Sequence, residues 1–330
     1  MTVRILDAAT VAELIDEASV LDSIRELFTT QGSAGEVGYA RVDLDHPAGW
    51  LRALPAYVVP QDLLGFKVLH RTEGVGMRYT IYVHRLGTGE LVGVVDGLEV
   101  TNLRTGAVSA VATEHLASPE VPAAAIIGTG PVARGQLRAL ELVRPAEEIR
   151  VFARTEENRN VFVDEMAPNV SGRLVATATL EAAVEGASIV TLATKASAPV
   201  ITAAHLRPGV HVNSVGPASR DRVEVDPGIF KSFDLVVCDS VDLVLDEAGD
   251  AYQAVLAHGL DADRVTELSD VVSGRAPGRV DRDQMTLFKS VGTGAQDLVV
   301  ASLLLDRATA MGMGTVVADL SSVKPLPLPR

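Results

Sequence analysis

The chain has 330 residues, 47% of them hydrophobic, which is enough for two domains with separate cores and excludes overall disorder. Its 43 Asp and Glu residues against 29 Lys and Arg residues give a net charge of −14. A surface with this average charge repels nucleic acids and anionic lipid headgroups, so neither is expected as a partner.

Two further features bear on the compartment. The one cysteine, Cys238, cannot form an internal disulfide and fits a reducing environment. The first residues lack the apolar stretch of a signal peptide, and no apolar run reaches the ~18 residues of a membrane span. The sequence therefore predicts a soluble, cytoplasmic protein.

The first third of the chain mixes helical and strand-like patterns. Val20, Ile24 and Phe28 recur at helical spacing, and Gly87-Thr-Gly89 is typical of a hairpin connection. A helix is expected over residues 101–118, with Thr101 or Asn102 as its N-cap. Strands are expected at 37–45, 50–59, 63–69, 79–84 and 91–95. This segment predicts an α+β domain with an antiparallel sheet.

From about residue 119 the pattern changes to short strands that alternate with helices. Helices are expected at 132–143 and 156–166, and a long one at about 293–311. Strands are expected at 123–127, 149–153, 174–176, 189–193, 210–215 and 235–238, with one more at 315–318. The alternation is typical of an α/β fold with a doubly wound parallel sheet.

A glycine turn follows the first strand of this second segment. Gly128 permits a tight turn, Gly130 lets the backbone approach a pyrophosphate, and Ala133 stands where close strand–helix packing needs a small residue. Pro131 and Val132 open the next helix, whose exposed amides and dipole favour an anion. A purely structural turn is the alternative, but the strand before and the helix after favour a dinucleotide-binding (Rossmann) site.

The end of the second strand indicates which dinucleotide binds. NAD-specific sites usually place an Asp or Glu there for the ribose hydroxyls, whereas this chain has Arg154 and Thr155. A guanidinium and a hydroxyl suit a 2′-phosphate, which predicts NADPH over NADH. The alternative is that Arg154 is merely solvated, since Glu156 and Glu157 lie nearby.

Three basic residues stand where the pattern calls for apolar side chains. Lys67 interrupts the strand expected at 63–69, and an unpaired lysine there is costly, so it needs an anion or a cleft. Arg52 interrupts another strand, and Arg104 falls in the first turn of the helix expected at 101–118, where an anion is favoured. Each alone is consistent with a structural ion pair. Together they predict a pocket for a substrate carboxylate.

Six segments, in this order, resemble the ornithine cyclodeaminase/μ-crystallin family. They are Arg52-Ala-Leu-Pro55, Gly65-Phe-Lys-Val68, Thr101-Asn-Leu-Arg-Thr105, Ile127-Gly-Thr-Gly130, Asn213-Ser-Val-Gly216, and Phe288-Lys-Ser-Val-Gly292 followed by Gln296-Asp297. The resemblance implies a homodimer whose Rossmann domain, residues 121–304, is inserted in an α+β substrate-binding and dimerisation domain, residues 1–120 and 305–330. It also implies that the strand at 315–318 belongs to that first domain.

The resemblance also assigns site residues. It implies that Arg52, Lys67 and Arg104 bind the substrate carboxylate and that Lys67 is a candidate proton donor. Thr194, Val215 and Ser290 are implied to line the cofactor site. For Asp297, its position in the family pattern implies a functional role. The alternative is a capping or electrostatic role at the start of its helix.

One position departs from the cyclodeaminase pattern. Cyclodeaminases of the family carry an aspartate after the Val-Gly pair, for the substrate's amino group, and counting back from Glu224 places Ala218 at that position. Ser219 is the alternative if the loop shifts by one residue. Without the carboxylate, cyclodeamination loses its expected base.

These features predict an NADPH-dependent reductase of a ketimine or cyclic imino acid, whose substrate side chain the sequence does not indicate. One alternative is an ornithine or lysine cyclodeaminase that uses NAD catalytically. The other is an NADPH-binding, crystallin-like protein without catalysis. No metal site is expected: the histidines lack ligand spacing, and Asp43-Leu-Asp-His46 is typical of a solvated turn.

Overall fold

The structure is a computed structural model that describes residues 2–34, 36–216 and 218–320. The chain divides into two compact units, the first formed by Met1–Asp16, Glu36–Val100 and Thr293–Arg330, the second by Glu17–Gly35 and Thr101–Gly292. The predicted domains, 1–120 with 305–330 and 121–304, differ from this division at 17–35, 101–120 and 293–304. The end of the predicted first domain, 321–330, lies outside the described residues.

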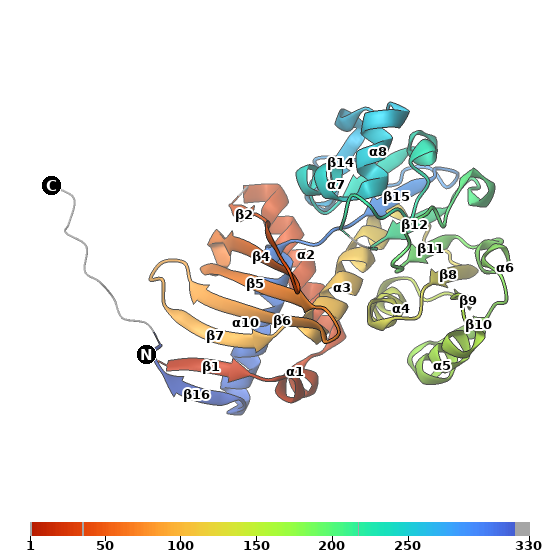
Figure 1. The fold of residues 1–330 in the computed structure, drawn as a ribbon. Helices are drawn as coiled ribbons and strands as arrows, with labels where there is room; N and C mark the ends of the chain where they lie inside the picture. Colours follow the sequence, from red (N-terminus) through yellow and green to blue (C-terminus); the bar gives the residue numbers. More distant parts are fainter. Residues whose placement is uncertain (1, 35, 217, 321–330) are drawn as a thin grey trace. The chain divides into compact units, whose positions relative to one another are not determined.

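The first unit is built on a mixed sheet with the strand order β16-β1-β7-β6-β5-β4-β2, with β3 paired to β4. All its pairs are antiparallel except β1 with β7. The last strand pairs with the first, so the C-terminal segment returns to this sheet as the resemblance implies (Figure 1). The elements are β1 (Thr2–Leu6), α1 (Ala8–Leu14), β2 (Val37–Tyr39), β3 (Val42–His46), β4 (Gly49–Val58), η1 (Val59–Gln61), β5 (Leu63–Thr72), β6 (Gly76–Arg85), β7 (Leu91–Asp96), α10 (Gly294–Met311) and β16 (Thr315–Ala318).

Helix α10 covers one face of this sheet and packs on β4, β5 and β6. Strand β5 has one buried face, on which the helix packs. Leu63, Gly65 and Lys67 are buried and the residues between them are more exposed, because successive side chains of a strand point to opposite faces. A Cβ at Gly65 would lie 2.8 Å from Cδ2 of Leu298, which α10 supplies. Glycine therefore allows the helix to approach the strand closely.

The second unit contains an all-parallel sheet with the order β10-β9-β8-β11-β12-β15-β13-β14. The chain runs outward from β8 through β9 to β10, then returns to the other side of β8 with β11. The predicted doubly wound sheet is confirmed, and this reversal is where such sheets bind ligands. Its strands are β8 (Ala123–Ile127), β9 (Glu148–Phe152), β10 (Arg173–Ala176), β11 (Ile189–Leu192), β12 (His211–Ser214), β13 (Leu235–Cys238), β14 (Val265–Glu267) and β15 (Thr286–Lys289).

Helices cover both faces of the parallel sheet. In β8, Ala124 and Ile126 pack in one core with α4 and α5, and Ala125 and Ile127 pack in a second core with α6, α7 and α8. Burial on both faces explains the uninterrupted apolar run of this strand. The helices are α2 (Glu17–Ala34), α3 (Leu98–Leu116), α4 (Pro131–Val143), α5 (Glu156–Met166), α6 (Leu180–Val184), α7 (Val241–Glu247), α8 (Gly249–His258) and α9 (Leu268–Val272), with short 3₁₀ turns η2 (Ala167–Asn169), η3 (Ala203–His205), η4 (Pro227–Ser232) and η5 (Ala262–Arg264). Within the described residues, every helix is too short or too polar to span a bilayer.

Several predicted bounds differ from the structure, and two of the differences bear on predicted site residues or their partners. Helix α3 begins at Leu98, where Asp96 Oδ1 accepts a hydrogen bond of 3.1 Å from the Leu98 amide. Thr101 therefore lies inside the helix and is not its cap, and Arg104 lies in the second turn instead of the first. The strand expected at 37–45 is divided into β2 and β3, which pair with different parts of β4.

Candidate functional site

The glycine turn after β8 has a backbone that requires glycine. Gly128 has φ +118°, and a Cβ there would lie 2.3 Å from the carbonyl oxygen of Ala193, at the end of β11. Its amide donates a 2.8 Å hydrogen bond to the Phe152 carbonyl oxygen. The turn therefore bends against the ends of the two strands that flank β8, and it is the tight turn expected at Gly128.

The start of α4 is shaped to receive an anionic group. Gly130 is the N-cap, none of the described side chains caps the helix there, and Pro131 occupies the first turn. A Cβ at Gly130 would meet nothing within 4 Å, so the space before the helix is open. Val132 and Ala133 follow in the first turn. Exposed amides, the positive end of the helix dipole and this open space fit the pyrophosphate of a dinucleotide.

The loop after β9 carries the residues predicted to choose between NADPH and NADH. The Arg154 side chain is exposed, and Thr155 is the N-cap of α5. Arg159, which sequence reasoning missed, is buried, and its Nη1 donates a 2.7 Å hydrogen bond to the Ala153 carbonyl oxygen. Its guanidinium also lies 5.9 Å from the centroid of the Phe152 ring. Arg159 therefore holds the loop that presents Arg154.

A buried carboxylate joins the ends of β11 and β12. Glu224 Oε1 accepts hydrogen bonds from the amide and the hydroxyl of Thr194, at 2.7 and 2.6 Å. Glu224 Oε2 accepts from Ser214 Oγ at 2.9 Å and from the Gly216 amide at 2.8 Å. Two of the residues predicted to line the cofactor are fixed in this way. Thr194 is hydrogen-bonded to Glu224, and Val215 lies between Ser214 and Gly216, which are both hydrogen-bonded to Glu224. Sequence reasoning assigned no role to this glutamate.

A second buried charge pair adjoins Glu224. Lys289 Nζ lies 2.9 Å from Asp250 Oδ2 and 3.0 Å from Ser214 Oγ, and both charged side chains are almost fully buried. Asp250 Oδ2 also accepts a 3.3 Å hydrogen bond from the Glu224 amide. Lys289 ends β15 next to Ser290, so this pair supports a third strand end at the same edge of the sheet.

Ser290, the third residue predicted to line the cofactor, is held by Asp239. Its hydroxyl donates a 2.7 Å hydrogen bond to Asp239 Oδ2, which also accepts from the Gly292 amide at 2.8 Å. Asp239 is fully buried and directly follows β13. The loop after β15 is therefore fixed by a carboxylate from the neighbouring strand.

In the first unit, the buried lysine has an anion. Lys67 Nζ lies 2.7 Å from Asp297 Oδ2, and the two side chains are 2% and 0% exposed. Asp297 belongs to the first turn of α10, where the helix dipole also favours a carboxylate. The sequence predicted that Lys67 needs an anion or a cleft, and the structure supplies the anion.

Arg52 is engaged by a carboxylate of the neighbouring strand. Its Nε and Nη2 donate to Asp43 Oδ1 and Oδ2, both at 2.6 Å. These hydrogen bonds, followed by the charges of Arg52 and Arg41, hold the pKa of Asp43 below its ordinary value. Two arginines therefore act on one carboxylate at this β3–β4 hairpin, and sequence reasoning missed Arg41.

The register of the sheet brings Arg52 and Lys67 onto one face. Leu54 lies directly opposite Lys67, and Arg52 precedes Leu54 by two residues. Because side chains alternate along a strand, Arg52, Leu54 and Lys67 all lie on the face that α10 covers.

Arg104 lies in the second unit. Its side chain is 6% exposed, and a Cβ at Gly292 would lie 2.6 Å from both terminal nitrogens of its guanidinium. Gly292 has φ +78°, so glycine is required both by the backbone and by the close approach of Arg104. The structure thus places Arg104 beside the loop that carries Ser290.

The loop after Gly216 contains the position at which cyclodeaminases carry an aspartate. Ala218 occupies it, and Ser219 next to it donates a hydrogen bond to the Asp221 carboxylate. The Ser219 hydroxyl is therefore engaged within its own loop.

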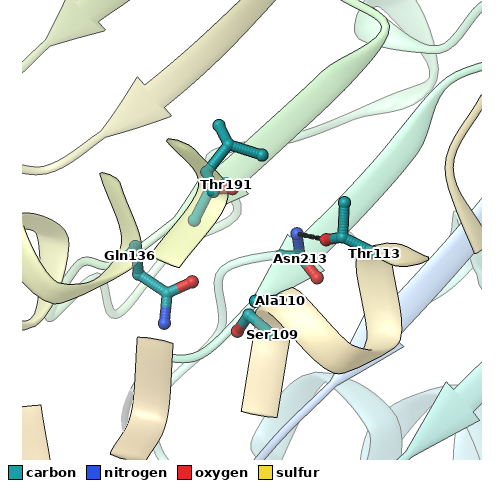
Figure 2. A pocket seen from close by; sticks show the side chains of 7 residues that line it. Ser109, Ala110, Thr113, Gln136, Thr191 and Asn213 are labelled. Atoms are coloured by element: carbon teal, nitrogen blue, oxygen red, sulfur yellow. Dashed lines mark hydrogen bonds between the residues drawn. The ribbon is translucent and has the colours of Figure 1, made fainter. Parts of the chain in front are cut away.

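A small polar pocket lies between the parallel sheet and α3 and α4 (Figure 2). Its lining residues are Ser109, Ala110, Thr113, Gln136, Leu140, Thr191 and Asn213, and Asn213 Nδ2 donates a 3.0 Å hydrogen bond to Thr113 Oγ1. Next to it His211 is fully buried, and this burial, helped by the charge of Arg279, lowers the pKa of the imidazole to about 3. The histidine is therefore neutral and hydrogen-bonded in the core. Among the described residues, no three His, Cys, Asp or Glu side chains are grouped so as to hold a metal ion.

Known proteins resemble this chain over most of its length. Residues 3–312 match the ornithine cyclodeaminase/mu-crystallin family. A Delta(1)-pyrroline-2-carboxylate reductase of Bacillus cereus is 34% identical over 229 residues, which are 69% of this chain and 70% of that protein. The ketimine reductase mu-crystallin of Rattus norvegicus is 33% identical over 264 residues, which are 78% of this chain and 80% of that protein.

A solved structure extends the likeness. The Delta(1)-pyrroline-2-carboxylate reductase of Thermococcus litoralis, in complex with NADH and L-proline, matches with a TM-score of 0.89 and 30% sequence identity. The match covers 94% of this chain and 99% of that chain.

Proposed function

The chain belongs to the ornithine cyclodeaminase/mu-crystallin family, as its motifs predict, and we propose that it reduces a carbon–nitrogen double bond next to a carboxylate. Its substrate class is a ketimine or a cyclic imino acid. The observation that carries the proposal is the buried Lys67–Asp297 pair, because it holds an ammonium group, which can donate a proton, within an otherwise apolar strand. The relatives named as pyrroline-2-carboxylate and ketimine reductases support the same reaction.

The cofactor is a nicotinamide dinucleotide, and we propose NADPH. The backbone of Gly128, Gly130 and Val132, with Pro131 opening α4, holds the pyrophosphate. Arg154 and Thr155 bind the 2′-phosphate, and Thr194, Val215 and Ser290 line the nicotinamide half. When bound in its reduced form, the cofactor supplies the hydride that reaches the imine carbon.

The three cations predicted from the sequence bind and polarise the substrate in this proposal. Arg52 and Arg104 hold the carboxylate, which orients the adjacent imine. Lys67 Nζ donates the proton that the imine nitrogen needs, and Asp297 holds the ammonium group in place. The imine nitrogen thus gains a proton as its carbon gains the hydride, which yields an amino acid.

The assignment of Arg52 to the substrate carboxylate needs a separate test, because its guanidinium already donates two hydrogen bonds to Asp43. We expect Arg52→Leu to raise KM for the imine by about tenfold or more, since a charge-assisted hydrogen bond is lost. Arg41→Leu is the matched variant, because Arg41 acts on the same Asp43 carboxylate. A larger rise in KM from Arg41→Leu than from Arg52→Leu would move the carboxylate-binding role to Arg41.

Cyclodeamination is disfavoured by Ala218, which has no carboxylate to accept a proton from a charged amine. The distinguishing experiment follows NADPH absorbance with 1-pyrroline-2-carboxylate and its six-membered piperideine analogue, and ammonia release from ornithine in the presence of NAD⁺. We expect NADPH consumption and no ammonia. Ammonia from ornithine without net cofactor change would support the cyclodeaminase, and tight NADPH binding without any turnover would support a binding protein.

We propose a homodimer formed through the face of the first sheet that α10 does not cover. Tyr57 and Leu64 lie opposite each other there and are 42% and 37% exposed, and the Phe66 ring stacks on that of Tyr82 at 4.8 Å. Exposed apolar surface of this kind is typical of protein interfaces. Light scattering should give twice the chain's mass of 34.7 kDa, and a monomer at micromolar concentration would contradict the proposal.

A cytoplasmic location is proposed from the cysteine. Cys238 is a free thiol and is buried, and burial raises its pKa well above the ordinary value. Burial makes the thiol unreactive, and the absence of a disulfide at Cys238 is in keeping with a reducing compartment. Cell fractionation tests this, and recovery of the protein in an extracellular fraction would contradict it.

A further inference from the structure

We propose that a buried ring of four residues places a fixed negative charge next to the nicotinamide half of the cofactor site and thereby favours the oxidised, cationic form of the nicotinamide. The ring consists of Glu224, Ser214, Lys289 and Asp250. Glu224 acts in it as a positioning residue, because it holds the two loops on which the cofactor rests. The inference rests on the proposed function only in taking this site to bind a nicotinamide dinucleotide.

The ring is closed by hydrogen bonds that the structure contains in full. Ser214 Oγ donates to Glu224 Oε2 at 2.9 Å and accepts from Lys289 Nζ at 3.0 Å. Lys289 Nζ donates to Asp250 Oδ2 at 2.9 Å, and the same oxygen accepts from the Glu224 amide at 3.3 Å. All four residues are buried, none more than 1% exposed. The hydrogen bonds therefore form a closed ring made only of buried protein groups.

The hydrogen bonds also favour the charged form of the Glu224 side chain. Each carboxylate oxygen accepts two hydrogen bonds, one of them from a backbone amide, of Thr194 or Gly216. The two hydroxyls that donate already accept elsewhere, Thr194 from the Ala196 amide and Ser214 from Lys289. Two backbone amides, which can only donate, and two hydroxyls therefore surround the Glu224 side chain, an arrangement that favours its carboxylate form. With one lysine and two acidic side chains, the ring has a formal net charge of −1.

The ring lies at the carboxyl ends of three adjacent parallel strands. Ser214 ends β12 and Lys289 ends β15, and Glu224 reaches Thr194 just beyond β11. In doubly wound sheets the cofactor lies over these carboxyl ends. A Cβ at Gly216 would lie 2.2 Å from Cδ of Glu224, so glycine at this position lets the loop close over the carboxylate. The ring is therefore directly beneath the residues proposed to line the nicotinamide.

A fixed negative charge at this place has a specific consequence. The nicotinamide ring is neutral when reduced and positively charged once it has given up its hydride. A carboxylate in a water-poor environment stabilises the cation and the transition state leading to it, but not the neutral form. A purely structural role of Glu224 would affect the binding of both forms equally.

The test is a fluorescence titration of the full chain with NADP⁺ and NADPH, without any imine. We expect Glu224→Gln to weaken NADP⁺ binding about tenfold more than NADPH binding, which corresponds to a rise of about 30 mV in the potential of the bound two-electron couple. Ser214→Ala is the matched control, because it breaks the same ring at its neutral member, and it should weaken both forms equally. An unchanged ratio of the two dissociation constants in Glu224→Gln would overturn the inference.

Asp250→Asn gives the same test through a second residue. It also raises the net charge of the ring by one, and its amide oxygen still accepts from Lys289, so we expect the same selective loss of NADP⁺ affinity. If Glu224→Gln does not fold, this variant decides, and equal weakening of both forms would overturn the inference. Failure of the wild-type chain to bind either form would instead overturn the cofactor assignment together with it, and a wrong imine substrate would affect neither titration.

Discussion

Replacing Lys67 by methionine removes the Nζ atom, which both pairs with Asp297 and is the proposed proton donor. Lys67 Nζ and Asp297 Oδ2 are 2.7 Å apart, and both side chains are shielded from water. Lys67→Met removes the cation, keeps most of the side-chain volume, and leaves the Asp297 carboxylate buried without this partner. Breaking a buried ion pair in this way costs about 3–5 kcal/mol of unfolding free energy. We expect that loss together with a loss of turnover, while NADPH affinity is retained.

The double variant Lys67→Met with Asp297→Leu separates stability from catalysis. Because an apolar pair can replace a buried ion pair without net cost, the double variant should recover most of the lost unfolding free energy. It should remain inactive, since it has no proton donor at that position. Urea unfolding and NADPH consumption give the two readouts. Turnover by either variant would refute the role of Lys67, and an unchanged unfolding free energy in Lys67→Met would refute the energetic reasoning.

Three further variants test separate parts of the structure. Arg154→Asp should reverse the preference for NADPH over NADH by at least tenfold, since a charge-assisted hydrogen bond is worth about 1.5–3 kcal/mol; an unchanged preference in steady-state kinetics would leave Arg154 without this role. Gly128→Ala should abolish NADPH binding and lower stability, because the new Cβ would lie 2.3 Å from the Ala193 carbonyl oxygen; wild-type affinity would show that the turn opens without cost. Burial raises the pKa of Glu267 from 4.5 to about 7, so the stability it contributes is fully present below pH 4.5 and is lost as the pH rises through 7. Glu267→Gln should therefore be more stable than wild type above pH 7, by up to about 3 kcal/mol, and equal melting temperatures at pH 8 would contradict this.

Much of the fold follows from the periodicity of the sequence. The strands at 123–127 and 235–238 were predicted at the bounds that the structure shows, because strands buried on both faces are uninterrupted apolar runs. The start of α3 was missed because Thr101 and Asn102 are both of residue types favoured at an N-cap, whereas the Asp96 side chain accepts from the amide of Leu98, where the helix begins. The extent of the β5–β6 hairpin was missed because residues 70–78 are mostly polar and mostly exposed, and no apolar alternation marks them as strand.

Site residues could be predicted from the sequence where a charged side chain interrupts an apolar pattern. Lys67 was recognised because a lysine in an apolar strand needs a reason, and the same rule applied to Lys289, at the end of the strand Thr286–Lys289, would have marked it too. Glu224 carries no local signal. Its partners Thr194 and Ser214 lie 30 and 10 residues away, and only the fold brings them to its carboxylate.

The proposed reaction carries a hydride from the cofactor to an imine carbon that bears a carboxylate. The most direct measurement uses NADPH deuterated at the transferred position, with 1-pyrroline-2-carboxylate as substrate and mass spectrometry and NMR of the product. We expect stoichiometric oxidation of the cofactor and proline with deuterium at the carbon that carries the carboxylate. Proline without deuterium, or ammonia release without net oxidation of the cofactor, would contradict it.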